Sequence, residues 1–423
     1  MLLEYDVSNF KSFRNEAYLD MRPAKNRVLK RFPNNFTALA SGQKVLKSSV
    51  IVGENAGGKS NFVQSVQFMK NLMTRNDLPI KSDLSCVHTA NVTRAGTRIN
   101  LTASDTSQSF QVEIALADII YRYSLTLDVL GIIAEKLDYS EGSDKPFENY
   151  FAAERARLDV SELAEQASYG DALTLPYQIS LRDEQSEALS HIVQTYNDSG
   201  RQITTLYLVL LATLGSPHCQ SVLRWFTEIL FIVAEPTPEF LVNVIDKTRL
   251  CDIMGSDKYL DIVRLIDASI SDFAVDGERP FAESRIERTS GTGRKYSRLA
   301  KDDSTGVRRF LLWAVCIYLT VYENKVVVAD EIDSCINPVL SDRVIAFIQG
   351  SAHTGQFVFT THNIFNLTLR TFMKEQINIV TKDVETLEST LYSLADFPDI
   401  RYDVNKELYE FYMQGALGGI ADA

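Results

Sequence analysis

Apolar residues alternate with polar ones at the start of the chain, a pattern that predicts β-strands. The alternation runs around Leu3, Tyr5, Val7 and Phe10 and returns at residues 18–19, so two short strands are expected before a buried strand at 48–52. Similar alternation with many β-branched residues comes back further along the chain. It predicts an antiparallel β subdomain with strands at 97–103, 109–115, 120–127 and 131–139.

The period of the pattern changes to that of helices between about residues 147 and 270. Gly, Pro or Asn-Asp-Ser-Gly segments separate the apolar runs there. The runs are short and carry no sustained heptad, so an inserted helical lobe is expected rather than a long coiled-coil arm. Its helices are predicted at 152–168, 182–196, 203–213, 219–233 and 258–270.

Strands alternate with helices beyond residue 272, which is typical of a mainly parallel sheet. The strands are predicted at 326–329, 357–360, 377–380 and 391–394, and the helices at 337–349 and 364–372. The chain is therefore expected to be an α/β protein in three parts. Residues 1–146 and 271–423 would form the two halves of one head, with residues 147–270 inserted between them as the helical lobe.

The composition is that of a folded protein. With 423 residues, 45% of them hydrophobic and 23% charged, the chain can bury a large core in more than one lobe. No window approaches the ~20 apolar residues of a membrane span, and the first residues lack the pattern of a signal peptide, so we expect a cytoplasmic protein with no membrane partner. The five cysteines are scattered and form no C-x-x-C pair, which argues against a disulfide framework or a zinc site.

The net charge of −12 argues against a surface that wraps nucleic acid over its whole extent, although a local basic groove stays open as an alternative. Several cations lie between Arg279 and Arg298, but acids are interspersed among them. That mixture favours a solvated hairpin.

The first chemical motif is a glycine-rich loop between the buried strand at 48–52 and an apolar-periodic helix. Its sequence follows the pattern G-x-x-x-x-G-K-[ST], in which backbone N–H groups wrap a phosphate, Lys59 reaches the outer phosphates and the hydroxyl of Ser60 binds Mg²⁺. We therefore predict an ATP site. Its nucleotide-binding residues are predicted to be Gly53, Asn55, Gly57, Gly58, Lys59, Ser60 and Asn61.

Two acids follow the apolar strand at 326–329. Ligands collect at the carboxyl ends of buried parallel strands, so Asp330 is predicted to join Ser60 in the Mg²⁺ shell. Glu331 is predicted to orient or deprotonate the water that attacks the γ-phosphate. A solvated acidic turn is the alternative, and the P-loop upstream favours the catalytic interpretation.

Two further elements complete the predicted site. The next apolar strand ends in Thr360-Thr361-His362-Asn363, where His362 would reach the γ-phosphate or the water. Ser304 and Gly306 open the apolar helix at 310–320, and such a helix N-terminus can bind an anion. On its own, however, Ser304 is better explained as an N-cap.

Taken in order, these four elements resemble the ATP-binding-cassette (ABC) ATPase heads of the RecF and SMC kind. The resemblance implies a head-to-head homodimer with two ATP molecules at the interface, each held by the P-loop of one copy and by Ser304 and Gly306 of the other. Asp333 and Ser334 would then form the dimer-contact loop.

A closer similarity is to the abortive-infection ATPases of bacterial phage defence, of the AbiLii/RloA type. It is carried by the segment from Val7 to Arg14, by 330–333 with Asn337-Pro338, by 361–363, and by the closing segment from Tyr412 to Gly419. It covers the two ends of the chain better than the middle. It implies a sensor or switch that controls a separately encoded toxic effector, often a nuclease, and it puts Lys11 and Phe13 near the nucleotide base, where ordinary surface-strand roles are the alternative.

Other functions remain as alternatives. A RecF-like or SMC-like repair ATPase that clamps DNA is the second hypothesis, and the net charge leans against it. A kinase or GTPase is the third, but no N-K-x-D motif is complete, and that hypothesis leaves Ser304 and His362 unexplained. After His362 only 61 residues remain (423 − 362), too few for a fused Toprim nuclease, so action on nucleic acid would come from a partner.

Overall fold

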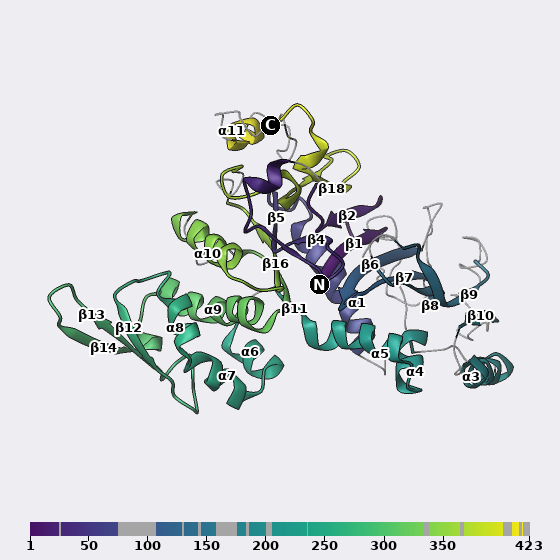
Figure 1. Ribbon diagram of the computed structural model, residues 1–423, viewed down its shortest axis with the longest axis horizontal. Helices are drawn as coiled ribbons and strands as arrows, with labels where there is room; N and C mark the ends of the chain where they lie inside the picture. The colour runs from purple at the N-terminus through teal and green to yellow at the C-terminus, as the bar shows by residue number, and fades with distance from the viewer. Residues whose placement is uncertain are drawn as a thin grey trace.

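The computed structural model describes residues 1–24, 27–74, 107–128, 131–142, 145–157, 176–182, 186–199, 205–234, 236–332, 338–363, 368–400, 408–413 and 417. Two large sheets lie against one another, and most of the helices pack on or beside them (Figure 1). The predicted strand at 97–103 lies outside the described residues, as do residues 333–337, which include the predicted dimer loop.

The first sheet is mainly parallel and has the strand order β11-β15-β16-β5-β17-β18. All its neighbouring pairs are parallel except β17 with β18. β5, β15 and β16 are buried along their whole length, as expected for strands covered on both faces. The strands are β5 (Ser48–Gly53), β11 (Leu230–Val233), β15 (Val326–Ala329), β16 (Gln356–Thr361), β17 (Ile377–Lys382) and β18 (Ser389–Ser393).

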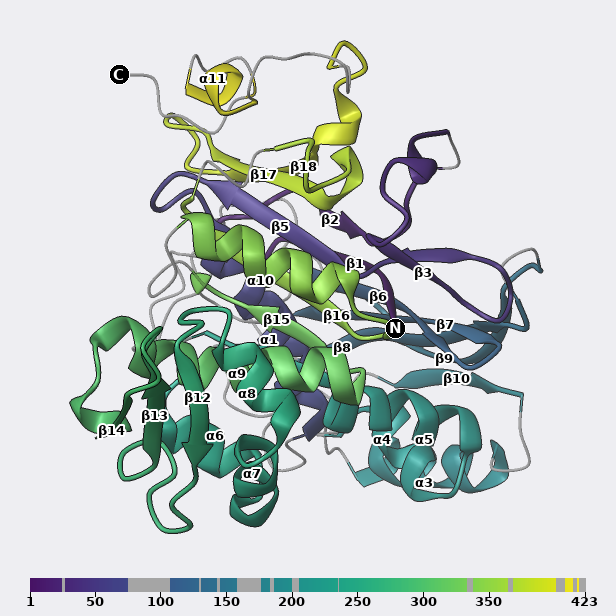
Figure 2. The ribbon, with the colours of Figure 1, turned by 60° about the vertical axis from the view of Figure 1, so that its left-hand side comes forward.

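Side chains from alternate positions of these strands enter two different cores. Ile51, Val326 and Val328 join the core that contains helix α1 (Lys59–Thr74) and the second sheet. The intervening Val327 and Ala329 join the core under α9 (Thr305–Glu323) and α10 (Pro338–Gly350), which lie together on the other face of the sheet (Figure 2). The layers are therefore helices, parallel sheet, α1, and antiparallel sheet.

The second sheet is antiparallel, with the order β10-β9-β8-β7-β6-β1-β2. Its inner face packs on α1, where the rings of Tyr5 and Phe62 lie 5.6 Å apart and the Tyr5 hydroxyl donates to Ser65 Oγ at 3.0 Å. The strands are β1 (Leu2–Ser8), β2 (Ala17–Asp20), β6 (Gln108–Leu116), β7 (Ile119–Asp128), β8 (Gly131–Ser140), β9 (Glu148–Arg155) and β10 (Tyr177–Leu181). The predicted antiparallel subdomain is confirmed at β6, β7 and β8.

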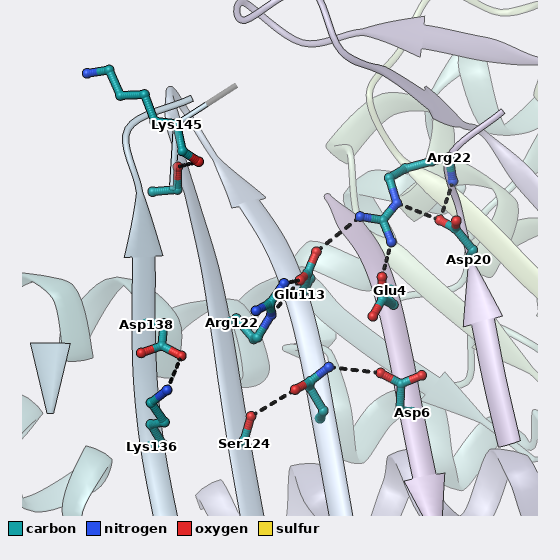
Figure 3. A network of polar contacts seen from close by, with 12 residues as sticks. Glu4, Asp6, Asp20, Arg22, Glu113, Arg122, Ser124, Lys136, Asp138 and Lys145 are labelled. Carbon is teal, nitrogen blue, oxygen red and sulfur yellow. Dashed lines mark hydrogen bonds and ion pairs between the residues drawn. The ribbon is translucent and has the colours of Figure 1, made fainter. Parts of the chain in front are cut away.

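The outer face of this sheet is polar and tied together by charge pairs (Figure 3). Arg22 lies among three carboxylates: its guanidinium contacts Glu4, Asp20 at 2.8 Å and Glu113 at 3.2 Å. Arg122 donates to the same Glu113 at 2.6 Å. The alternation of apolar and polar residues read from the sequence thus separates a core face from a charged face.

Two of the helices predicted between residues 147 and 270, at 152–168 and 219–233, are wrong in part. β9 replaces the first part of the helix predicted at 152–168, because its backbone pairs with β8 and β10 and buries Phe151 and Ala153. Pairing across the sheet overrides the helical propensity of a segment rich in Ala, Glu and Arg. The helix predicted at 219–233 ends early: α5 (Pro217–Arg224) and one π-turn are followed by β11 at the edge of the parallel sheet.

The other helices of this region are α3 (Ser186–Ser199), α4 (Tyr207–Thr213), α6 (Pro238–Val244), α7 (Lys247–Met254) and α8 (Asp257–Val263). α6 and α7 were not predicted. The division of the chain into three domains stays a prediction, since this segment supplies strands to both sheets.

A third sheet contains the predicted solvated hairpin, which is confirmed. It comprises β12 (Ile270–Ala274), β13 (Arg285–Thr289) and β14 (Lys295–Leu299), and all but the last residue of β14 are exposed. The short pair β3 (Phe36–Ala38) and β4 (Lys44–Leu46) adds two strands that were not predicted before β5. The predicted helix at 364–372 is wrong for residues 368–372, which form turns, and α11 (Leu408–Met413) follows near the end of the chain. Among the described residues, no helix is both long enough and apolar enough to cross a membrane.

Candidate active site

The glycine loop joins the end of β5 to the start of α1, and at Gly53 and Gly58 the packing leaves no room for a side chain. A Cβ atom on Gly53 would lie 2.4 Å from the carbonyl oxygen of Val380 on β17. Gly58 has φ +121°, and a Cβ there would lie 2.5 Å from Ser389 Oγ on β18. The loop is therefore wedged against the β17–β18 hairpin in a backbone conformation that favours glycine. This strand, loop and helix are the arrangement of P-loop nucleoside triphosphatases.

Lys59 is the first residue of α1, and its side chain is buried over the loop. Its ammonium donates to the carbonyl oxygens of Gly53 at 2.7 Å and Glu54 at 2.8 Å. It also lies 3.2 Å from Nδ1 of His362, which follows β16. A lysine ammonium can only donate, so Nδ1 of His362 accepts and the ring proton is on Nε2.

His362 connects Lys59 to Glu331. Its Nε2 lies 3.3 Å from Oε1 of Glu331, and both side chains are partly exposed, at 37% for His362 and 54% for Glu331. The chain thus brings a cation, an imidazole and a carboxylate into one row at the carboxyl ends of β5, β16 and β15. The row is open to solvent at the Glu331 end, where a substrate water could enter.

Asp330 and Glu331 come directly after β15. Asp330 is buried, and its Oδ1 accepts a hydrogen bond from the Thr360 hydroxyl at 2.5 Å. The same hydroxyl oxygen accepts from the backbone N–H of Glu331 at 2.8 Å. Glu331 has φ +50°, a left-handed conformation that is uncommon for a residue with a side chain. The sequence predicts Thr360 only as the last residue of the strand at 357–360, because a single threonine at a strand end carries no signal of this role.

The remaining loop residues have distinct surroundings. Asn55 is exposed on the loop, Ser60 is half-buried in the first turn of α1, and the Asn61 amide donates to Ser12 Oγ at 2.8 Å. The hydroxyl of Ser60 and the carboxylate of Asp330 are hard oxygen ligands of the kind that Mg²⁺ prefers. The donor set therefore fits Mg²⁺, and these two residues would hold it.

The turn between β1 and β2 covers the N-terminal end of α1. Lys11 contacts Gln64 of α1. The Ser12 hydroxyl accepts a hydrogen bond from the Asn61 amide, and the Ser12 carbonyl accepts one from the backbone N–H of Ser389 at 2.7 Å. Phe13 is fully buried and packs edge-on against Phe62 with ring centroids 6.4 Å apart. Phe13 is therefore a core residue and has no surface-strand role, whereas Lys11 lies at the surface near the P-loop helix. That these two residues lie near a nucleotide base stays a prediction.

Ser304 and Gly306 lie at the N-terminus of α9. Ser304 is the N-cap, its Oγ accepting from the Val307 N–H at 3.3 Å, and it is exposed. Only two residues join α9 to β15, so the helix runs back along the sheet and its N-terminus points toward the same edge as Asp330. The contacts of Ser304 are thus those of an N-cap on an exposed helix end, and a role in a second copy's site stays a prediction.

The C-terminal segment lies near the P-loop. The Tyr392 hydroxyl of β18 donates to the carbonyl of Leu417, and Tyr412 of α11 is buried. Burial raises the pKa of Tyr412 to about 12, and the charge of Glu54 in the loop adds to that rise. The glycines of the closing motif, at 415, 418 and 419, lie outside the described residues.

The chain is similar to known proteins in its three-dimensional structure but not detectably in its sequence. No protein-family profile and no curated protein matches the chain. Among solved structures, it is similar to the SMC head domain from Thermotoga maritima, with 13% identity, 93% of this chain and 98% of the other covered, and a TM-score of 0.43.

Two further solved structures are similar to the chain. One is an SMC head domain with an extended coiled coil bound to the C-terminal domain of ScpA, from Pyrococcus furiosus, with 13% identity, 93% and 96% coverage and a TM-score of 0.39. The other is an SMC head domain with a coiled coil and joint from Pyrococcus yayanosii, with 10% identity, 97% and 99% coverage and a TM-score of 0.41. The fold itself rests on the topology described above. It agrees with the predicted fold class, because a P-loop lies at the end of a mainly parallel sheet and that sheet joins an antiparallel β subdomain.

Proposed function

We propose that this chain is an ATPase of the ABC type that closes as a head-to-head dimer on ATP and opens after hydrolysis. One observation carries the proposal: Lys59, Asp330, Glu331 and His362 come from three segments up to 303 positions apart and meet at one end of the parallel sheet, beside a glycine loop. A structural core has no need for this combination of groups at a partly exposed edge. P-loop phosphoryl transfer uses a lysine on the phosphates, a carboxylate on Mg²⁺ and a group that positions the nucleophile, and this cluster offers each of them.

Each of these residues has its own role in the proposed hydrolysis. Backbone N–H groups of the loop and the Lys59 ammonium bind the phosphates, and Lys59 leaves the loop carbonyls to do so. Mg²⁺, when held by Ser60 and Asp330, would neutralise charge on the β- and γ-phosphates. Glu331 orients the attacking water and accepts its proton, and His362 moves from Lys59 to the γ-phosphate side of the site.

The second half of each site would come from another copy. In a single chain the N-terminus of α9 is exposed and carries a serine and a glycine, so its free N–H groups can meet the γ-phosphate bound by a partner. We therefore assign Ser304 and Gly306 a role in trans.

This assignment can be tested by mixing two inactive variants. Lys59→Ala removes the phosphate contact, and Ser304→Arg blocks the helix end. Each protein alone should lose ATPase activity, but their mixture should regain part of it, because one site of the mixed dimer has an intact Lys59 and an intact partner Ser304. Ser297→Arg, on the exposed strand β14, is the control and should stay active. A mixture without recovery, or full activity of Ser304→Arg alone, would contradict the trans assignment.

We further propose that this ATPase is the sensor or switch subunit of an anti-phage system and controls a separate effector, a nuclease or another toxin. The support is the sequence resemblance to abortive-infection ATPases. Bacteria carrying the gene with its neighbours should resist phage, and Lys59→Ala should abolish the resistance. Salt-sensitive DNA binding that appears only with ATP, without phage resistance, would favour the DNA-clamping alternative instead.

A further inference from the structure

Thr360 connects the two acids that the proposed mechanism uses. It lies near the end of β16 and is fully buried. Its hydroxyl donates to Asp330 Oδ1 at 2.5 Å, and its oxygen accepts from the Glu331 backbone N–H at 2.8 Å. One hydroxyl therefore fixes the side chain of the first acid and the backbone of the second.

The backbone at Glu331 needs such a restraint. Its φ of +50° is a left-handed conformation that residues with a side chain seldom adopt, and it persists only where surrounding contacts enforce it. The hydrogen bond from the Glu331 N–H to Thr360 is such a contact. In this conformation the Glu331 carboxylate points to His362, with 3.3 Å between Oε1 and Nε2.

The surroundings of Thr360 explain why a hydroxyl here is not simply a packing choice. The preceding residues of β16, Phe357, Val358 and Phe359, are apolar and buried, and a β-branched valine would fit the strand equally well. A buried hydroxyl is unfavourable unless it is hydrogen-bonded, and here both of its bonds go to the Asp330-Glu331 pair.

We propose that Thr360 is a positioning residue for ATP hydrolysis: it sets the orientation of Asp330 and Glu331 relative to each other without touching the substrate. This inference rests on the proposed ATPase function and adds a residue to it. Because Thr360 acts on the geometry of Glu331 rather than on the phosphate contacts of Lys59, its loss should slow the chemical step more than it weakens ATP binding.

The test compares Thr360→Val with Thr360→Ser in the full chain. Thr360→Val keeps the shape and removes both hydrogen bonds, so kcat should fall by about tenfold or more, while the affinity for a fluorescent ATP analogue should stay within about threefold. Thr360→Ser keeps the hydroxyl and should restore kcat to within about threefold of the wild type. In a Glu331→Gln background, Thr360→Val should reduce hydrolysis little further, since both changes act on the same group.

Thr320→Val is the matched control. Thr320 is equally buried, and its hydroxyl donates to the Cys316 carbonyl within α9, at the other end of β15 from Asp330. It should alter thermal stability slightly and leave kcat unchanged. Thr360→Cys gives a second route if Thr360→Val does not fold, because a thiol is only a weak hydrogen-bond partner and should lower kcat in the same way.

The outcomes separate this inference from the function it rests on. The positioning role alone is overturned if the wild type hydrolyses ATP and the folded Thr360→Val and Thr360→Cys variants have the same kcat. If Thr360→Val loses ATP affinity and thermal stability but keeps the kcat of the wild type, the role of Thr360 is purely structural. The proposal is overturned in that case as well. A folded wild type without ATPase activity would overturn the proposed function and this role with it.

Discussion

Substitution of Gly58 tests how the P-loop is packed, because a side chain at this position would cause both backbone strain and steric overlap. Its φ of +121° is a conformation that L-residues rarely adopt, and an added Cβ would lie 2.5 Å from Ser389 Oγ and 2.9 Å from Ser389 Cβ. Ordinary contacts of a Cβ atom begin at 3.4 Å, so the overlap with Oγ is 0.9 Å (3.4 − 2.5). Ser389 cannot easily move, since its hydroxyl donates to Gly57 O at 2.6 Å and its N–H to Ser12 O at 2.7 Å.

Gly58→Ala should therefore destabilise the fold by the sum of both terms. Backbone strain costs about 1–3 kcal/mol and overpacking about 1–3 kcal/mol, so we expect about 2–6 kcal/mol in all. Gly142→Ala is the matched control, because Gly142 has a similar φ of +131° and nothing within 4 Å of an added Cβ. The free energy of unfolding of Gly142→Ala should fall only by the cost of backbone strain, about 1–3 kcal/mol.

Denaturant unfolding of the two variants measures the difference directly. Ser389→Gly removes the two atoms closest to an added Cβ at position 58 and leaves Ser12 Oγ at 3.2 Å, so the double variant should be less destabilised than the sum of the two single changes. The reasoning would be refuted if Gly58→Ala cost no more than Gly142→Ala, or if the effects of Gly58→Ala and Ser389→Gly were simply additive.

Three further predictions concern single side chains. Lys59→Ala should abolish ATP binding, measured by titration with a fluorescent ATP analogue, and lower the melting temperature, because the buried ammonium no longer donates to the carbonyls of Gly53 and Glu54. His362→Ala should keep ATP binding and lower kcat by about 10²–10³-fold, the range for loss of one group that stabilises charge in the transition state, and unchanged turnover would refute its role. Burial raises the pKa of Glu135 from 4.5 to about 7, so its contribution to stability is present below about pH 4.5 and is lost as the pH rises through about 7. Glu135→Gln cannot ionise at this position, so its melting temperature should fall less than that of the wild type between pH 4.5 and 7. An equal fall in both proteins would contradict the raised pKa.

The sequence alone predicts the parts of the fold that depend on local pattern. The run Val326-Val327-Val328-Ala329 before Asp330 is apolar throughout, and such a run indicates a buried strand with its acids at the edge. The glycine loop and the strand before His362 are equally clear. These local signals place the candidate residues at strand ends.

Strand pairing over long distances is what the pattern could not predict. β11 forms an edge of the parallel sheet by pairing with β15, almost 100 residues later, and its four apolar residues read equally well as the end of a helix. β9 is similar, because the residues of Ala152 to Arg155 favour a helix and only the partner strands make them a strand. Long-range contacts decide both cases.

The same limit applies to the supporting residues of the site. Thr360 and Ser389 are common residues without a motif, and each gains its role from a partner 29 or more positions away in the sequence. Phe13 shows the same limit: the sequence leaves a surface-strand role open, but its burial against Phe62 makes it part of the core. A motif thus identifies the groups that do chemistry more readily than the groups that hold them.

In the proposed cycle, ATP closes two copies of this chain and Glu331 then drives hydrolysis. Glu331→Gln keeps the size of the side chain and removes the carboxylate, so the variant should bind ATP, hydrolyse it at least about 10²-fold more slowly, and accumulate as a dimer. Light scattering coupled to size-exclusion chromatography, with and without ATP and Mg²⁺, measures this directly. We expect the mass to double with ATP in Glu331→Gln but not in Glu331→Gln combined with Lys59→Ala. A Glu331→Gln protein that turns over ATP like the wild type, or has the same mass with and without ATP, would contradict this cycle.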